Sequence, residues 1–362
     1  MKIVHVVGTR PNIVKTAPVV AALSDISPET DQVIIHTGQH YDRNMSEIFF
    51  EQLGVRDPDH YLEVGSGTHA EQTARTMERI EPLLAELEPD LVLVPGDVNS
   101  SLAAALTATK MGIEVGHVES GLRSFDRTMP EEVNRLLVDQ IAEVLFTHSE
   151  SADLNLDREG IPAERVHFVG NTMIDTLVRL EEVFRSLDAA SALGLDSGAY
   201  LLVTLHRPAL VDTPLLLEAI DQLESIAREI PVVFPVHPRT RAAIPERKDS
   251  PGLQLVDPVG YLEFLSLEAD AAAVLTDSGG IQEETTYLGV PCFTLRDNTE
   301  RPITVELGTN TLLGLDPERI GTIPSLLAET DGPRGASEVP PLWDGRAGER
   351  VAEVLTGQSA AG

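Results

Sequence analysis

Three acidic residues between positions 91 and 135 could move protons on a small organic substrate. Asp97 and Glu119 each follow a short apolar run typical of a buried strand, and Glu131 follows a proline. In a parallel α/β sheet the strands end at one edge, and ligands bind outside those ends. We therefore expect Asp97 and Glu119 to share that edge. The alternative is that all three acids cap helices or lie in solvated loops, which are the commoner places for Asp and Glu.

A second stretch, LTDSGGIQEE, predicts a phosphate-binding loop. Gly279 and Gly280 would let the backbone approach a ligand closely, and a helix expected from Ile281 would turn free N–H groups toward an anion. Glu284, one turn into that helix, could accept hydrogen bonds from ribose hydroxyls. The alternative is a tight turn in which Ser278 caps the helix.

Further basic residues stand where predicted strands end or predicted helices begin. Arg10 and Lys15 lie in the turn and first helical turn after the N-terminal strand, where a helix start already favours anions. His206 and His237 each end a predicted strand of the second half, and a histidine there could hold or protonate a leaving phosphate. Surface or structural roles are the alternatives for these residues.

The order of the elements predicts an α/β protein with two domains. Strand-like apolar runs alternate with helical patterns in both halves, and 362 residues exceed the usual size of one hydrophobic core. We predict an N-terminal Rossmann-like domain over residues 1–172, joined by a C-terminal helix over 345–362. A second Rossmann-like domain would cover 173–344, and each domain would hold an open parallel sheet.

The charge balance argues against several partners. With 58 acids against 27 bases the net charge is −31, which disfavours a nucleic acid or an anionic membrane as partner. Only four of the bases are lysines and the acids are spread over the whole chain, so we expect a halophilic protein. The N-terminus begins a strand without a signal-peptide core, and no apolar run approaches the roughly 20 residues that cross a bilayer. A cytoplasmic protein is therefore expected.

Motifs for cofactors and metals are missing from the sequence. No G-x-G-x-x-G follows a strand, and neither G-x-x-x-x-G-K-[ST] nor a zinc-binding H-E-x-x-H or H-x-x-E-H occurs. The single cysteine, Cys292, excludes an internal disulfide and a site of several thiolates, and it is expected to be a small core residue. We expect no cofactor and no metal.

Several short segments carry a resemblance to a known family. In chain order they are GTRPNIVKTAPV, TGQH, PGD, GHVESGLRS, MPEEVNR, HR, PVHP, DSGGIQEE and RDNTERP. They resemble the non-hydrolysing UDP-N-acetylglucosamine 2-epimerases, from residue 2 to about residue 315. The resemblance implies a glycosyltransferase-B-like fold with two Rossmann-like domains around a cleft. It also implies the interconversion of UDP-GlcNAc and UDP-ManNAc by a homodimer.

The resemblance implies a role for individual residues. Asp97, Glu119 and Glu131 match the family's catalytic acids, and His206 matches its catalytic histidine. The expected substrate-binding positions, with His237 added from its place at a strand end, are Arg10, Lys15, His237, Val259, Phe264, Ser278, Gly279, Gly280, Glu284 and Arg301.

Two further segments can be compared with the family. Gln39 and His40 match a segment that touches a second, allosteric UDP-GlcNAc in several bacterial members. After His206 and Arg207 the chain reads Pro-Ala-Leu (208–210), where the family commonly has Glu-Asn. Polar contacts of that loop with UDP are therefore not carried over.

The resemblance also implies a reaction in which UDP leaves C1 of the sugar and returns. A carboxylate would remove the C2 proton to give 2-acetamidoglucal, and protonation from the other face would give the manno epimer. The three acids would divide proton transfer and oxocarbenium stabilisation, with their individual roles open. Two other functions stay open: a glycosyltransferase that uses a UDP-sugar, and a non-catalytic UDP-sugar sensor.

Overall fold

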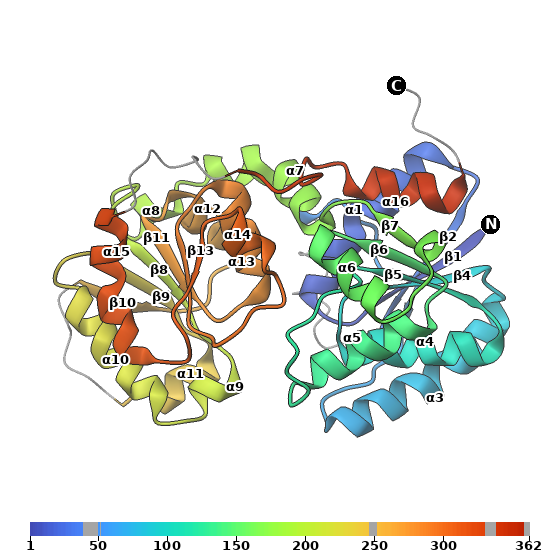
Figure 1. Cartoon of the computed structure of the whole chain (residues 1–362), viewed down its shortest axis with the longest axis horizontal. Helices are drawn as coiled ribbons and strands as arrows, with labels where there is room; N and C mark the ends of the chain where they lie inside the picture. The colour runs from blue at the N-terminus through green and yellow to red at the C-terminus, as the bar shows by residue number, and fades with distance from the viewer. Residues whose placement is uncertain (39–49, 51, 246–251, 330–337, 358–362) are drawn as a thin grey trace. The chain divides into compact units, whose positions relative to one another are not determined.

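The structure, a computed structural model, describes residues 1–38, 50, 52–245, 252–329 and 338–357 of the chain. The predicted allosteric residues Gln39 and His40 lie outside the described residues. The chain forms two compact units, one of Met1–Arg179 with Pro341–Gly362 and one of Leu180–Pro340 (Figure 1). In the described part of the chain, no helix is long and apolar enough to cross a membrane.

The first unit is built on a parallel sheet. Within the described residues it has seven strands in the order β3-β2-β1-β4-β5-β6-β7, so the strand order reverses between β1 and β4. Ligands of open α/β sheets bind beyond the strand ends at such a reversal. The strands are β1 (Lys2–Val7), β2 (Asp31–His36), β3 (His60–Tyr61), β4 (Leu91–Pro95), β5 (Glu114–Val118), β6 (Val144–Thr147) and β7 (Val166–Phe168).

Helices cover both faces of this sheet. Successive side chains of a strand point to opposite faces, and here the side chains on each face are apolar and must be buried. Val4 and Val92 pack on one face with residues of α3, α4 and α5, whereas Ile3 and Leu93 pack on the other with residues of α1 and α16. The helices are α1 (Arg10–Ile26), α3 (His69–Leu87), α4 (Asn99–Met111), α5 (Pro130–Ile141), α6 (Glu150–Arg158), α7 (Thr172–Ser186), which runs past the unit boundary, and α16 (Ala347–Thr356).

The C-terminal helix α16 is attached to the first unit by a buried carboxylate. Asp175 of α7 accepts hydrogen bonds from the backbone N–H groups of Ala347 (3.0 Å) and Gly348 (2.6 Å) at the start of α16. Burial raises the pKa of Asp175 to about 6, although the two N–H groups favour its ionised form. Just before α16, the Trp343 indole N–H donates to the His148 carbonyl (2.9 Å).

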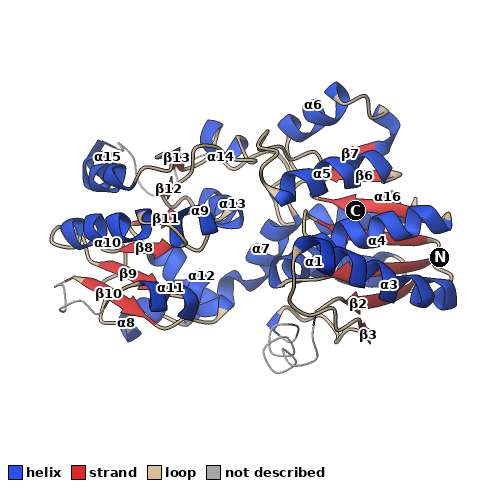
Figure 2. Cartoon of the chain, turned by 90° about the horizontal axis from the view of Figure 1, so that it is seen from below, coloured by secondary structure: helices blue, strands red, loops and turns tan. Residues whose placement is uncertain are grey.

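The second unit repeats this plan with a six-stranded parallel sheet, counted over the residues that the structure describes (Figure 2). Its order is β10-β9-β8-β11-β12-β13, so the strand order reverses between β8 and β11. The strands are β8 (Leu201–Thr204), β9 (Val232–Pro235), β10 (Leu253–Val256), β11 (Ala273–Thr276), β12 (Cys292–Thr294) and β13 (Asn310–Leu312).

Helices again flank the strands of the second unit (Figure 2). The strand residues Leu201 and Val203 pack with residues of α10, whereas Leu202 and Val274 pack with residues of α12 and α13 on the other face. The helices are α8 (Ala189–Ala192), α9 (Pro208–Val211), α10 (Leu215–Ile226), α11 (Pro238–Ala243), α12 (Tyr261–Asp270), α13 (Gly279–Leu288), α14 (Ile303–Glu306) and α15 (Ile323–Glu329). The predicted fold class, two parallel-sheet α/β units, is confirmed.

Candidate active site

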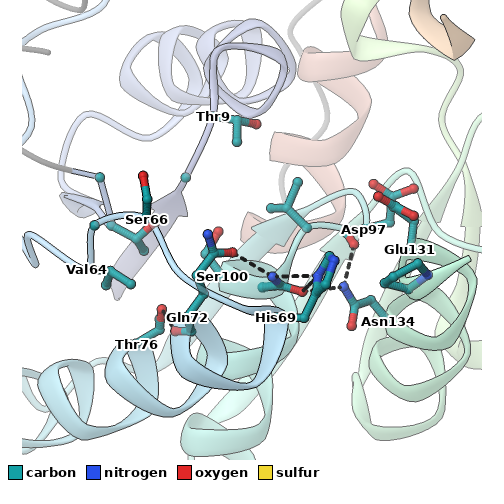
Figure 3. A pocket seen from close by; sticks show the side chains of 17 residues that line it. Thr9, Val64, Ser66, His69, Gln72, Thr76, Asp97, Ser100, Glu131 and Asn134 are labelled. Carbon is teal, nitrogen blue, oxygen red and sulfur yellow. Dashed lines mark hydrogen bonds between the residues drawn. The ribbon is translucent and has the colours of Figure 1, made fainter. Parts of the chain in front are cut away.

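A pocket lies in the first unit where the strand order reverses. It has a volume of about 330 Å³ and is lined by the loops after β1, β2, β3 and β4 and by the starts of α3, α4 and α5. Figure 3 shows Asp97 and Glu131 together at one end of this pocket, with Val64, Ser66 and Thr76 toward the other. Two of the three predicted catalytic acids therefore share one cavity.

Asp97 is held in place and remains accessible. Its side chain is 25% exposed and forms an ion pair with Arg135, whose guanidinium also contacts Glu132 (2.7 Å). The Asn134 amide donates to the backbone carbonyl of Asp97 (2.8 Å). Neither Arg135 nor Asn134 was predicted from the sequence. Their spacing from Glu131 on one helix was the available signal, because residues three and four apart share a helix face.

Glu119 directly follows β5, the strand beside β4, but it does not line that pocket. Its backbone is left-handed (φ 68°), which is unusual for a residue with a side chain, and its carboxylate forms an ion pair with Lys15. Both side chains are buried. The neighbouring Gly96 (φ 62°) leaves space here, since a Cβ on it would lie 3.1 Å from both charged groups. The expectation that Asp97 and Glu119 end neighbouring strands at one edge is confirmed.

The turn between β4 and Asp97 is supported by a buried charged network. The His117 ring, in β5, contacts the Asp139 carboxylate (2.6 Å) through Nδ1 and the Gly96 carbonyl (2.9 Å) through Nε2. Asp139 also pairs with Arg123 (2.7 Å). Burial favours a raised pKa for Asp139, but His117 and Arg123 together hold that pKa below its ordinary value. His117 therefore supports the turn that carries Asp97.

The two cations that the sequence grouped near the N-terminus have different surroundings. Arg10, the first residue of α1, is exposed, whereas Lys15 is buried against Glu119. The turn before α1 needs a glycine, because a Cβ on Gly8 would overlap the Ser100 hydroxyl. Close packing of this turn against α4 brings Lys15 to the carboxyl end of β5.

In the second unit, His206 is oriented by a buried acid. The His206 side chain is 56% exposed, and its Nδ1 lies 2.9 Å from the Asp277 carboxylate, which is 1% exposed. Asp277 also accepts the backbone N–H groups of His206 (2.9 Å) and Arg207 (2.7 Å). Burial favours a raised pKa for Asp277, but these partners hold the pKa below its ordinary value. From the sequence, Asp277 was expected only as part of a loop.

The DSGG segment opens α13 beside a buried arginine. The helix begins at Gly279, two residues before the predicted start at Ile281, because Ser278 is extended and both glycines take helical angles. Arg301 pairs with Glu283 (2.9 Å) and Glu300 (2.8 Å). A Cβ on Gly279 would lie 2.5 Å from the Arg301 guanidinium, so a side chain at this position would have to displace it. N–H groups and a guanidinium at one place suit a diphosphate.

The remaining predicted binding residues lie apart from this helix start or deeper in the unit. Glu284 is buried and accepts a hydrogen bond from the Tyr261 hydroxyl (3.1 Å). Val259 and Phe264 are partly buried and pack against the apolar cluster on the α12 and α13 face of the sheet. His237, shortly after β9, is exposed.

The chain is similar to known proteins over nearly its whole length. A family model described as UDP-N-acetylglucosamine 2-epimerase matches residues 24–356. The UDP-N-acetylglucosamine 2-epimerase of Methanocaldococcus jannaschii is 43% identical over 98% of this chain and 99% of its own length. Its crystal structure, in complex with UDP-GlcNAc and UDP, has a TM-score of 0.89 at 42% identity and covers 99% of this chain and 100% of that one.

Two other proteins bear on substrate and fold. A UDP-2,3-diacetamido-2,3-dideoxy-D-glucuronate 2-epimerase of Pseudomonas aeruginosa is 43% identical over 87% of this chain and 88% of its own. A glycosyltransferase of kitacinnamycin has a TM-score of 0.58 at 13% identity, with 99% of each chain covered, which shows a shared fold alone. The predicted glycosyltransferase-B-like fold is thus confirmed.

Proposed function

The chain belongs to the UDP-N-acetylglucosamine 2-epimerase family, and from this premise we propose that it interconverts UDP-GlcNAc and UDP-ManNAc. The observation that carries the proposal is the similarity, at 42% identity over 99% of this chain, to a solved epimerase in complex with UDP-GlcNAc and UDP. Asp97 and Glu131 in one pocket supply the acid–base groups that such a reaction needs.

The reaction begins with the departure of UDP. The C2 proton of the sugar is barely acidic, but cationic character at C1 acidifies it as the C1–O bond breaks. UDP leaves with the bonding electrons, a carboxylate takes the C2 proton, and the C2–H electrons form the C1–C2 double bond of 2-acetamidoglucal. In the second half, a UDP oxygen attacks C1 while a proton reaches C2 from the opposite face. Fixed charges placed where these charges develop lower the barrier.

The acids divide this work in the proposed mechanism. Asp97 lines the pocket, is accessible and is held by Arg135, so its carboxylate suits proton removal. Glu131 lines the same pocket and suits proton exchange on the sugar. Glu119, paired with Lys15, supplies a buried negative charge that would stabilise positive charge at C1. This division is the point that single substitutions test.

Residues of the second unit would bind UDP. The start of α13 and Arg301 suit the diphosphate, and Glu284 suits the ribose hydroxyls. His206 receives its orientation from Asp277, which leaves its other ring nitrogen to donate a proton or hydrogen bond to the leaving phosphate. Arg10 is exposed at the start of α1 and is proposed as a further phosphate contact.

The test is NMR of UDP-GlcNAc incubated with the protein in D₂O. We expect UDP-ManNAc to form and deuterium to enter at C2. Absence of both would end the epimerase proposal, and transfer of GlcNAc to an added acceptor would favour the glycosyltransferase. Asp97→Asn and Glu119→Gln should each slow turnover by about 10² to 10⁴. Turnover within tenfold of wild type would remove that residue from the mechanism.

A second candidate substrate follows from the Pseudomonas relative, whose sequence identity to this chain equals that of the Methanocaldococcus enzyme. Its name gives a UDP-sugar uronate with a second acetamido group. The net charge of −31 disfavours an additional substrate carboxylate. We therefore expect kcat/KM for UDP-GlcNAc to exceed that for the uronate by at least about tenfold. A higher kcat/KM for the uronate than for UDP-GlcNAc would assign the uronate as substrate.

We also propose that the protein is a halophilic, cytoplasmic homodimer. The acidic residues spread over the whole chain and the low number of lysines, four, support salt adaptation. The family resemblance supports the dimer. The melting temperature should rise with KCl concentration. A loss of stability at molar KCl would contradict salt adaptation. Light scattering after gel filtration should give twice the 39.2 kDa chain mass.

A further inference from the structure

One buried carboxyl group of the second unit has no part in the proposed reaction. Glu268 of α12 is 0% exposed, and no described group donates a hydrogen bond to either of its carboxyl oxygens. An ionised carboxylate would lose its hydration there without gaining any donor, which is strongly unfavourable. A neutral carboxylic acid avoids this cost. Glu268 is therefore held in its protonated form.

The position of Glu268 follows from the geometry of α12, which carries it, and from the packing of α13 on the same face of the sheet. Tyr261 precedes it by about two helical turns, so both lie on the same side of α12. The Tyr261 hydroxyl reaches across to Glu284 of α13 (3.1 Å). α12 and α13 cover the same face of the sheet, where Leu267 and Ile281 belong to one apolar cluster. Glu268 therefore lies on the side of α12 from which Tyr261 reaches Glu284.

Among the described residues, the titratable groups that interact with Glu268 carry no positive charge. They are Tyr261 on its own helix, Glu284 on α13 and Cys292 on β12. Burial, and then Glu284, raise the pKa of Glu268 well above its ordinary value. Burial also raises the pKa of Cys292 to about 12, so this thiol stays neutral.

Glu284 is the member of this group that titrates near neutral pH. Burial raises its pKa to about 7, the Tyr261 hydroxyl favours its ionised form, and the neighbouring Glu283 opposes it. Glu283 is itself paired with Arg301 (2.9 Å). Near neutral pH, Glu268 thus keeps its carboxyl proton while Glu284 loses one.

We propose that Glu268 is a positioning residue whose carboxyl proton is donated in a hydrogen bond to Glu284, which stabilises the ionised form of Glu284. The inference rests on the proposed function, in which Glu284 accepts the ribose hydroxyls of a UDP-sugar. An ionised carboxylate only accepts, so it can bind two vicinal hydroxyls, whereas a neutral acid must itself donate. Affinity for the nucleotide sugar therefore rises with pH as Glu284 ionises. Enzymes elsewhere keep a carboxylic acid neutral in an apolar site so that it can donate.

The experiment compares Glu268→Leu with Glu268→Gln by calorimetric titration with UDP-GlcNAc, from about pH 5.5 to about pH 8.5. Leucine removes the donor, so the midpoint of the affinity profile should move to higher pH, with binding about tenfold weaker near pH 7. Glutamine keeps an N–H donor without a titrating group and should stay within about threefold of wild type. Glu263→Gln, which removes an exposed carboxylate from the same helix, should leave the profile unchanged.

Two outcomes of the titration would overturn the proposal. If both Glu268 variants move the midpoint to lower pH, Glu268 is ionised and repels Glu284. If neither variant moves it, the two groups are not coupled. Circular dichroism checks that each variant folds, and Glu268→Met replaces the leucine variant if that one does not.

A measurement without ligand separates this proposal from the proposed function. Infrared spectra above the titration of Glu284 should show the C=O stretch of one neutral carboxylic acid, and Glu268→Gln should remove it. Absence of that band in the wild type would overturn the proposal whatever the protein binds. A protein that shows the band but does not bind UDP-GlcNAc would refute the proposed function alone.

Discussion

The buried pair of Lys15 and Glu119 offers a quantitative test of how the first unit is built. The two side chains are only 8% and 7% exposed, so water and salt screen their attraction little. Lys15→Met keeps the unbranched chain and removes the charge. The carboxylate of Glu119 would then stay buried without its ion-pair partner.

The expected magnitude follows from that burial. Removal of one partner of a buried ion pair costs about 3–5 kcal/mol, because the remaining charge has lost both its hydration and its partner. The double variant Lys15→Met with Glu119→Gln buries no charge and should lose only about 1–2 kcal/mol. The two sites should therefore be coupled by at least about 2 kcal/mol.

The assay is the free energy of unfolding from urea titration of wild type, both single variants and the double variant. Lys2→Met is the matched control, because Lys2 lies 3.7 Å from Asp31 in a pair that is 34% and 62% exposed. Such surface pairs contribute about 1 kcal/mol or less. A loss below about 1 kcal/mol in Lys15→Met, or a double variant as unstable as the sum of the singles, would refute the reasoning.

Three further changes test other parts of the structure. The folded-state pKa of Asp175 is raised to about 6 from 3.8. The protonated side chain therefore contributes most to the free energy of unfolding at acid pH, and this contribution is lost as pH rises through 6. Urea titrations should therefore show wild type losing about 3 kcal/mol relative to Asp175→Asn between about pH 4 and pH 7, whereas a constant difference would contradict this. Arg135→Lys cannot bridge both carboxylate partners and should lower kcat about 10- to 100-fold with folding retained, measured by product formation; an unchanged kcat would exclude a positioning role. Gly121 and Gly112 both have positive φ (78° and 77°), but a Cβ would lie 2.6 Å from a backbone carbonyl at Gly121 and in open space at Gly112. Gly121→Ala should therefore lower the free energy of unfolding in urea by more than about 2 kcal/mol, and Gly112→Ala by about 1 kcal/mol. Equal losses would show that the close contact is unimportant.

Several features of the fold and the site could be predicted from the sequence. Apolar runs that end at polar residues mark buried parallel strands, so the pattern alone assigned Asp97 and Glu119 to one sheet edge. The glycines of DSGG indicated a helix start open to an anion, and α13 does start there. These are local properties, because strand pattern, turn chemistry and helix starts depend on neighbouring residues.

Only the tertiary structure decided which charged residues meet. Lys15 was expected beside Arg10 on the substrate, yet it pairs with Glu119, because β1 lies beside β4 and β4 beside β5. Asp277 orients His206 for the same reason, since β8 lies beside β11. Ion pairs and burial depend on strand order, which brings distant segments together and which no local pattern specifies. The sequence by itself thus determined the elements and the residues at their ends, and the fold determined their partners and their charge.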